Sequence, residues 1–206
     1  MSLMQSTVTF APSDFPPLAV GFFGLGTGYL IYGPQELFRY PGRNASVDLG
    51  TGVWGLWMPG FMQFFTGLFL FAGLSIFGTF TKMAPLYMAA LAFTAYGVHW
   101  FAIGWNRYRQ ADPRSNVGMT VAFTIISVLG IFVFFKAGDP PVAGLFIGLT
   151  GVYVTDFFAS LKPDFARPGV LGERGLGFFH IGTGLWLMYL TWATVLNFVL
   201  KFNLPL

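Results

Sequence analysis

Six long stretches of this sequence contain no charged residue, and they constrain the fold more than any other feature. They cover residues 15–35, 49–81, 83–106, 115–135, 140–155 and 175–200. The hydrocarbon core of a bilayer is about 30 Å thick and is crossed by about 20 helical residues. Five stretches reach that length, and the stretch 140–155 reaches it if the helix continues past Asp156 to residue 161.

A low content of charge separates this chain from soluble proteins. Asp, Glu, Lys and Arg make up 9% of the residues, against about a quarter in a soluble domain. Strands of a membrane β-barrel alternate polar and apolar residues, which the stretch 67–72 (Gly-Leu-Phe-Leu-Phe-Ala) does not do. We therefore predict an all-α membrane protein, a single domain over residues 1–206 with a bundle of six transmembrane helices. The predicted spans are about 16–35, 51–77, 84–106, 116–135, 141–161 and 176–200.

The remaining composition limits the chemistry. The net charge of +3 is spread over the connections, and no basic run suits nucleic acid. Cysteine is absent, so the chain has no disulfide, thiol nucleophile or iron–sulfur cluster. Residues 1–17 lack the basic start and apolar core of a signal peptide. We expect the lipid bilayer as a partner, and no nucleic acid, metal or cofactor.

Lysine and arginine predict the orientation, because cytoplasmic connections carry an excess of positive charge. Eight basic residues follow the first, third and fifth spans, and three lie on the opposite side. We therefore predict that the odd-numbered connections face the cytoplasm and that both termini lie outside. The eight are Arg39, Arg43, Arg107, Arg109, Arg114, Lys162, Arg167 and Arg174, and the three are Lys82, Lys136 and Lys201.

Glycine offers the close backbone contact that holds helices together in lipid. The chain has 27 glycines, among them GxxxG patterns in residues 24–28 and 144–148 and a further pair in residues 182–184. These patterns predict tight helix contacts, either within one chain or between copies of it.

Few polar residues lie at membrane depth, and polar groups there are costly enough to mark functional positions. No Lys or Arg lies in the middle of a span, and the one acidic residue, Asp156, lies near an edge. This argues against a proton pump with buried carboxylates and against a strong anion trap. A hydrogen-bonding, aromatic interior remains, which suits a small solute that is neutral or becomes neutral in transit. The polar set is Gln63, Thr66, Thr94, Tyr96, His99, Asn106, Thr150, Tyr153, His180, Thr183 and Asn197.

Each of these polar residues also has a structural interpretation. A threonine in a membrane helix bonds to its own backbone, and Gln63 can bridge two helices. His99 and His180 lie on different predicted helices. They can ligate a haem b, carry protons near neutral pH, or donate to neighbouring carbonyls, and the sequence leaves these alternatives open.

Three segments resemble signatures of the acetate uptake transporter family. Residues 14–24 (DFPPLAVGFFG) resemble its N-P-A-P-L-G-L-x-G-F-G signature, and residues 59–67 (PGFMQFFTG) are similar to its G-G-x-x-Q-x-x-A-G pattern. Residues 92–100 (AFTAYGVHW) resemble A-F-T-S-Y-G-x-F-W. The chain departs from the family at Asp14, Phe15, Ala19 and Leu70, and its connection before the third span is longer.

The resemblance implies a six-helix protein of the plasma membrane, or of the inner membrane in a bacterium. It implies a ring-shaped hexamer with a path through each protomer for acetate or a related small carboxylic acid, and no enzyme activity. By position in the motifs, the family's pore constriction falls on Phe23, Tyr96 and Leu149.

The expected mechanism is a hydrophobic constriction through which the acid passes with its proton. Gln63, Thr94, His99 and His180 are the polar residues expected along the path. Passage of the neutral acid buries no charge, whereas an anion needs donors to replace its hydration shell. Three alternatives stay open: an accessory subunit without transport, a channel for another small neutral solute, and a haem-bearing electron carrier.

Overall fold

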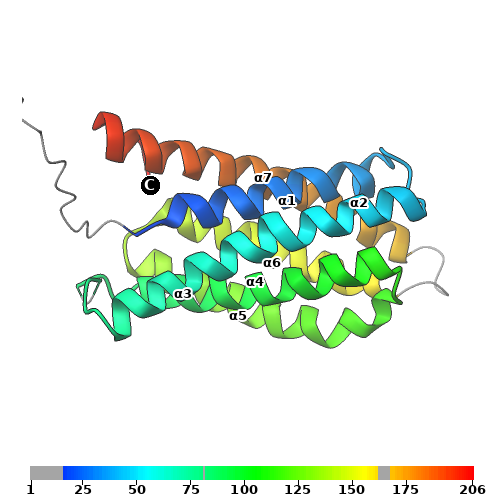
Figure 1. Cartoon of the computed structure of the whole chain (residues 1–206), viewed down its shortest axis with the longest axis horizontal. Coiled ribbons are helices and arrows are strands. Elements are labelled where there is room, and N and C mark those ends of the chain that lie inside the picture. Colours follow the sequence, from blue (N-terminus) through cyan, green and yellow to red (C-terminus); the bar gives the residue numbers. More distant parts are fainter. Residues whose placement is uncertain (1–15, 81, 162–167) are drawn as a thin grey trace, which may run out of the picture.

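The computed structural model describes residues 16–80, 82–161 and 168–206, with side chains from residue 170 in the last range. These described residues form helices and short connections and contain no β-strand. The helices run side by side along the long axis of an elongated bundle (Figure 1). Asp14 and Phe15 of the first signature, and Lys162 and Arg167 of the orientation argument, lie outside the described residues.

The second helical pass is continuous but contains an irregular turn. Its π-helical part surrounds Pro59, and proline has no N–H to donate to the preceding turn, which favours such a local widening. The elements in chain order are α1 (Leu18–Leu37), α2 (Ala45–Gly55), η1 (Leu56–Phe61, π-helical), α3 (Met62–Ser75), α4 (Leu86–Arg109), η2 (Pro113–Asn116, 3-10), α5 (Val117–Lys136), α6 (Pro140–Ser160) and α7 (Pro168–Leu200).

Within the described residues, five helical segments are long and apolar enough to cross a membrane, which supports a multi-pass membrane protein. Helix α1 is not among them, although it is 20 residues long. It lies packed between α7 and the second pass, and most of its residues from Gly21 to Glu36 are buried, so it needs little apolar outer surface. The sixth span and the hexamer stay predictions. The five segments are Ala45–Ser75, Leu86–Arg109, Pro113–Lys136, Pro140–Ser160 and Val170–Leu200.

The helices extend beyond the uncharged stretches of the sequence. Helix α7 starts at Pro168 where residue 176 was predicted, and the second pass starts at Ala45 where residue 51 was predicted. Helix α4 continues to Arg109 where the predicted span ends at residue 106. These extra turns bring charged side chains into helices, where neighbouring helices can pair them.

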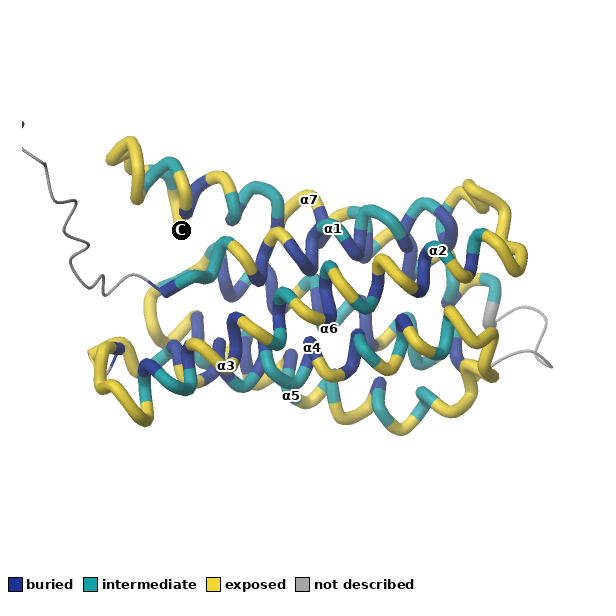
Figure 2. Tube along the Cα trace, viewed as in Figure 1, coloured by how far each residue is buried: buried dark blue, intermediate teal, exposed yellow. Residues whose placement is uncertain are grey.

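The helices enclose a shared interior. Helix α1 packs on α7 and on the second pass, α4 packs on the second pass, and α6 lies between α5 and α7. Buried residues face the inside of this arrangement and exposed residues cover its outside (Figure 2). Large apolar side chains such as Ile125, Phe132 and Trp192 are exposed, as expected for a surface that meets lipid.

The glycine patterns divide between internal and external faces. A Cβ atom on Gly28 would lie 2.6 Å from Cγ of Pro59, so this glycine lets α1 approach the second pass. In the other pattern, a Cβ on Gly148 would meet Thr183 of α7, whereas Gly144 has only the Trp186 nitrogen at 3.9 Å. The first GxxxG pattern therefore serves contacts within one chain.

Replacing Gly104 by alanine is expected to destabilise the bundle. A Cβ atom there would lie 2.7 Å from the Leu56 nitrogen and 2.8 Å from the Gly52 carbonyl oxygen, and backbone cannot move aside as a side chain can. Overpacking of this kind costs about 1–3 kcal/mol. Gly118→Ala is the matched control, because open space surrounds Gly118 and alanine in a helix is favoured over glycine by about 0.5–1 kcal/mol. Thermal unfolding in detergent compares them, and equal midpoints would contradict the packing argument.

Candidate functional site

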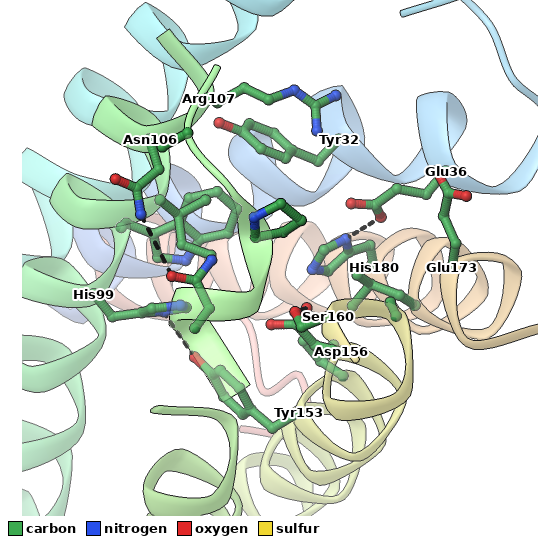
Figure 3. Close-up of a pocket in the computed structure, with 18 of the residues that line it drawn as sticks. Tyr32, Glu36, His99, Asn106, Arg107, Tyr153, Asp156, Ser160, Glu173 and His180 are labelled. Carbon is green, nitrogen blue, oxygen red and sulfur yellow. Dashed lines mark hydrogen bonds and ion pairs between the residues drawn. The ribbon is translucent and has the colours of Figure 1, made fainter. Parts of the chain in front are cut away.

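Two cavities enter the bundle from opposite ends. The polar cavity has a volume of about 450 Å³ and lies at the end formed by the α1–α2 and α4–α5 connections. Figure 3 shows its labelled side chains, which converge from α1, α4, α6 and α7. Its lining consists of Tyr29, Tyr32, Glu36, Arg43, His99, Trp100, Ile103, Asn106, Arg107, Gln110, Ala111, Asp112, Pro113, Asn116, Val152, Tyr153, Asp156, Ala159, Ser160, Glu173, Leu176 and His180.

The apolar cavity lies at the other end, beside the α3–α4 and α5–α6 connections. Its volume is about 300 Å³, and Asp139 is the one charged side chain among the described residues that line it. Its lining consists of Leu18, Phe22, Leu25, Gln63, Met83, Pro85, Leu86, Ala89, Ala92, Phe93, Tyr96, Phe134, Ala137, Asp139, Val142, Leu145, Phe146, Leu149 and Leu187.

The same faces of α1, α4, α6 and α7 line both cavities. Along α1, α4 and α6 the lining residues recur every three or four positions, which is the spacing of one helical face. On α7 they are Glu173, Leu176, His180 and Leu187. On α4 the apolar cavity ends at Tyr96 and the polar cavity begins at His99. On α6 the change falls between Leu149 and Val152. The cavities are therefore separated by about one turn of α1, α4 and α6 and by about two turns of α7.

An aromatic layer fills the gap between the two cavities. We define it as Tyr29, Tyr96, His99, Trp100, Phe123 and Tyr153. The Tyr96 and Tyr153 rings stack at 5.6 Å between centroids, and the His99 and Phe123 rings lie 4.8 Å apart. The Tyr153 hydroxyl is 3.3 Å from Nδ1 of His99. These contacts hold the rings in place across the interior.

The structure brings together two of the three predicted constriction residues. Tyr96 and Leu149 are buried and line the inner end of the apolar cavity. Phe23 does not lie with them, because it is 43% exposed on the outside of the chain. Its neighbour Phe22 is 3% exposed, lines the cavity, and lies 5.6 Å from the Phe93 ring. Successive residues of a helix differ by about 100° in direction, so a shift of one position exchanges the inner face for the outer.

The predicted polar residues lie in three places: at the apolar cavity, at the polar cavity, and away from both. Gln63 is 1% exposed and lines the apolar cavity. His99 and His180 line the polar cavity. Thr94 lines neither cavity among the residues described, because it faces α3 at Gly67, where an added Cβ atom would clash with its side chain and backbone. A place for Thr94 along a solute path therefore stays a prediction.

Several buried polar atoms at the cavities have no hydrogen-bond partner within the described part of the chain. They are Oη of Tyr29, Nε2 of His99 and Nε1 of Trp100 beside the polar cavity, and both side-chain amide atoms of Gln63 beside the apolar cavity. Leaving such a buried group unpaired costs about 1–3 kcal/mol. A polar solute or a water molecule in the cavities would satisfy these atoms.

A buried ion pair closes one side of the polar cavity, and hydropathy gave no indication of it. Nε of Arg107 is 2.6 Å from Oδ1 of Asp48, and Arg107 also donates to Oε1 of Gln35 at 2.6 Å. Gln35 donates in turn to the Thr51 hydroxyl at 2.8 Å. Arg43 is a second partner of Asp48 at 3.1 Å. Arg107 lines the polar cavity, so a cation is present at this end of the interior although no Lys or Arg lies in the middle of a predicted span.

Acidic residues also lie inside the bundle, against expectation. Glu36 is 6% exposed, and its Oε2 atom lies 2.6 Å from Nδ1 of His180. Asp156, also on the cavity wall, accepts a hydrogen bond from Ser160 at 3.0 Å. Hydropathy placed Glu36 and Asp48 outside the spans because it treats each charge as an edge. Helical spacing in α1 could have indicated it, because Glu36 follows Tyr32 by four positions and so lies on the same helix face.

The two histidines face the same cavity, and each Nδ1 atom already has a partner. Nδ1 of His99 pairs with the Tyr153 hydroxyl, and Nδ1 of His180 pairs with Glu36. The haem alternative stays a prediction, which an absorption spectrum of the purified protein tests.

Two carboxyl groups outside the helical spans have shifted acidities. Burial raises the pKa of the Asp139 carboxyl at the mouth of the apolar cavity, and a hydrogen bond from the Val142 amide offsets part of this effect. A side-chain hydrogen bond from Arg114 lowers the pKa of Asp112 at the polar end.

Comparison with known proteins adds information on the fold. No family model matches this sequence, and no curated protein matches it. A solved structure described as the bacterial acetate channel SatP matches with a TM-score of 0.69 and 16% sequence identity. The match covers 93% of this chain and 97% of that chain. At this identity the likeness establishes a shared fold, and it supports the remote resemblance found in the sequence.

Proposed function

We propose that the two cavities are the two halves of a path across the membrane for a small carboxylic acid such as acetate. The aromatic layer is the gate between them. The observation that carries the proposal is the alignment of both cavities along the same helix faces, with about one helical turn between them on α1, α4 and α6. The fold shared with an acetate channel and the unpartnered polar atoms beside the layer support it.

The acid crosses the aromatic layer in its neutral form. Among the described residues, the layer and the apolar cavity contain no Lys or Arg that could replace the hydration of an anion. Their hydrogen-bonding groups, such as the Gln63 amide and the Tyr29 hydroxyl, suit a neutral polar solute. A carboxylic acid with a pKa of about 4.3 is protonated about once in several hundred molecules at pH 7. Each molecule that crosses therefore carries one proton with it.

We propose that the protein works in the plasma membrane as a ring-shaped hexamer. The exposed large apolar side chains of the outer face, such as Phe132 and Trp192, suit contact with lipid or with neighbouring copies. The mass of the detergent-solubilised protein, measured by light scattering with correction for detergent, tests the assembly. A monomeric mass in several mild detergents would contradict it.

Acetate flux into vesicles tests the proposed function. Purified protein is reconstituted into liposomes that contain a pH-sensitive dye, and acetate is added outside. We expect the lumen to acidify faster than in protein-free liposomes, because every neutral molecule that enters releases a proton. A pH that is lower outside the liposomes than inside should accelerate uptake of labelled acetate. Flux that ignores the gradient would contradict neutral-acid passage, and rates equal to protein-free liposomes would contradict acetate transport.

A channel for another small neutral solute is the second candidate. The absence of Lys and Arg from the described lining of the apolar cavity favours any neutral polar solute as well as it favours a neutral acid. A panel of acetate, urea and ammonia in the same vesicles distinguishes the two. Flux of urea or ammonia without flux of acetate would support the second candidate, and no flux of any solute would favour an accessory subunit.

A further inference from the structure

Three ionisable side chains meet on the wall of the polar cavity, from three different helices. Oε2 of Glu36 on α1 lies 2.6 Å from Nδ1 of His180 on α7, and Asp156 of α6 lines the same cavity (Figure 3). Glu36 and His180 are 6% and 5% exposed. Tyr29, which is 1% exposed and whose hydroxyl has no partner among the described residues, also lines this cavity, and its ring lies 4.4 Å from the His180 ring.

Charge pairing singles out Asp156 among the carboxyl groups of this cavity. Glu36 pairs with His180, Glu173 pairs with Arg39, and Asp112 pairs with Arg114. The hydrogen bond of Asp156 within the described residues comes from the neutral Ser160 hydroxyl.

The other titratable groups that line the cavity with Asp156 come from several elements. Helix α1 contributes Tyr29, Tyr32 and Glu36, and α4 contributes His99 and Arg107. Helix α7 contributes Glu173 and His180, α6 itself contributes Tyr153, and the connections contribute Arg43 and Asp112. The guanidinium of Arg107 is held by Asp48 and Gln35.

The charge of this group changes by one with a single proton. With Glu36 ionised, His180 charged and Asp156 ionised, the three side chains carry one net negative charge, and one added proton makes them neutral. An uncompensated charge on the wall of a cavity inside a membrane protein is costly. A proton is therefore the ligand that this arrangement takes up.

We propose that Asp156 and the Glu36–His180 pair form an exchangeable proton-binding site, which protonates a carboxylate solute before it reaches the aromatic layer. This inference rests on the proposed function and adds the source of the proton. The Asp156 carboxyl gives its proton to the carboxylate oxygen of the solute and becomes a carboxylate, and water in the cavity returns a proton from the bulk. For a solute moving the other way, the neutral acid gives its proton to Asp156 and leaves as the anion.

Infrared spectroscopy of the purified full-length protein tests the site without transport. A protonated carboxyl gives a C=O stretching band that disappears when the group ionises. We expect a band that titrates with pH in the wild type and is lost in Asp156→Asn. Asp112→Asn is the matched control, because Asp112 lines the same cavity but pairs with Arg114, and it should keep the band. Spectra of wild type and Asp156→Asn with the same titrating bands would overturn the proposal.

Ser160→Ala is the second variant, since it leaves the carboxyl in place. Loss of the hydrogen bond from Ser160 to Asp156 should move the C=O band to higher frequency, and an unmoved band would contradict its assignment to Asp156. In vesicles, Asp156→Asn should lose the stimulation of acetate uptake by a pH gradient. Absence of acetate flux in the wild type and in every variant would contradict the proposed function. The infrared bands test the proton site independently of transport.

Discussion

Replacement of Ala89 by phenylalanine is expected to block solute flux through the chain. Ala89 lies on the cavity-lining face of α4, two turns before Tyr96, and is 8% exposed. A phenyl ring there occupies a large part of a cavity of about 300 Å³. Because the ring blocks this passage, the rate of acetate flux should fall roughly tenfold or more. This corresponds to a free-energy barrier higher by at least about 1.4 kcal/mol.

Ala102→Phe is the control for this experiment. Ala102 is on the same helix but is exposed on the outside of the bundle, so a ring there meets lipid and leaves the cavities open. Acetate flux into vesicles compares the two variants after equal reconstitution. Equal flux in Ala89→Phe and in wild type would show that the apolar cavity is not part of the path.

Replacement of Arg107 by alanine is expected to destabilise the protein strongly. The side chains of Arg107 and Asp48 are 11% and 10% exposed, and their charged atoms lie 2.6 Å apart. Removing one partner of a buried ion pair costs about 3–5 kcal/mol, because the other charge remains buried without compensation. Arg43 also contacts Asp48, so we expect the lower end of this range.

Thermal unfolding in detergent, followed by tryptophan fluorescence, measures this effect. Arg114→Ala is the matched control, because the pair of Arg114 with Asp112 is about half exposed on both sides, and water and salt screen an exposed pair so that it adds little to stability. The double variant Arg107→Gln with Asp48→Asn should recover part of the loss, since neither charge remains. A midpoint for Arg107→Ala as high as that of Arg114→Ala would contradict the pairing.

The membrane bundle follows from the sequence because long uncharged stretches have one stable environment. The ends of its helices do not follow in the same way. Hydropathy treats a charge as the edge of a span, but α1 continues through Glu36 and α4 continues through Arg107. Charges from different helices neutralise one another there, as Arg107 of α4 does with Asp48 of α2, and a single-residue scale contains no information on such pairs.

The candidate site was predictable where a residue type and a helix face agree. Tyr96, Leu149 and Gln63 lie on inner faces and line a cavity. Phe23 illustrates the limit of a motif match, because an error of one position turns a side chain from the interior to the lipid. Thr94 illustrates another limit, since its packing against Gly67 depends on the approach of two helices that the sequence does not specify.

The central claim is that the two cavities open on opposite sides of the membrane and are separated by the aromatic layer. The chain has no cysteine, so single cysteines can be placed at Ala159 of the polar cavity and at Ala89 of the apolar cavity. A membrane-impermeant thiol reagent is then applied to one side of sealed vesicles of known orientation. We predict that Ala159→Cys reacts from one side only and Ala89→Cys from the other side only. Reaction of both cysteines from the same side would contradict the account.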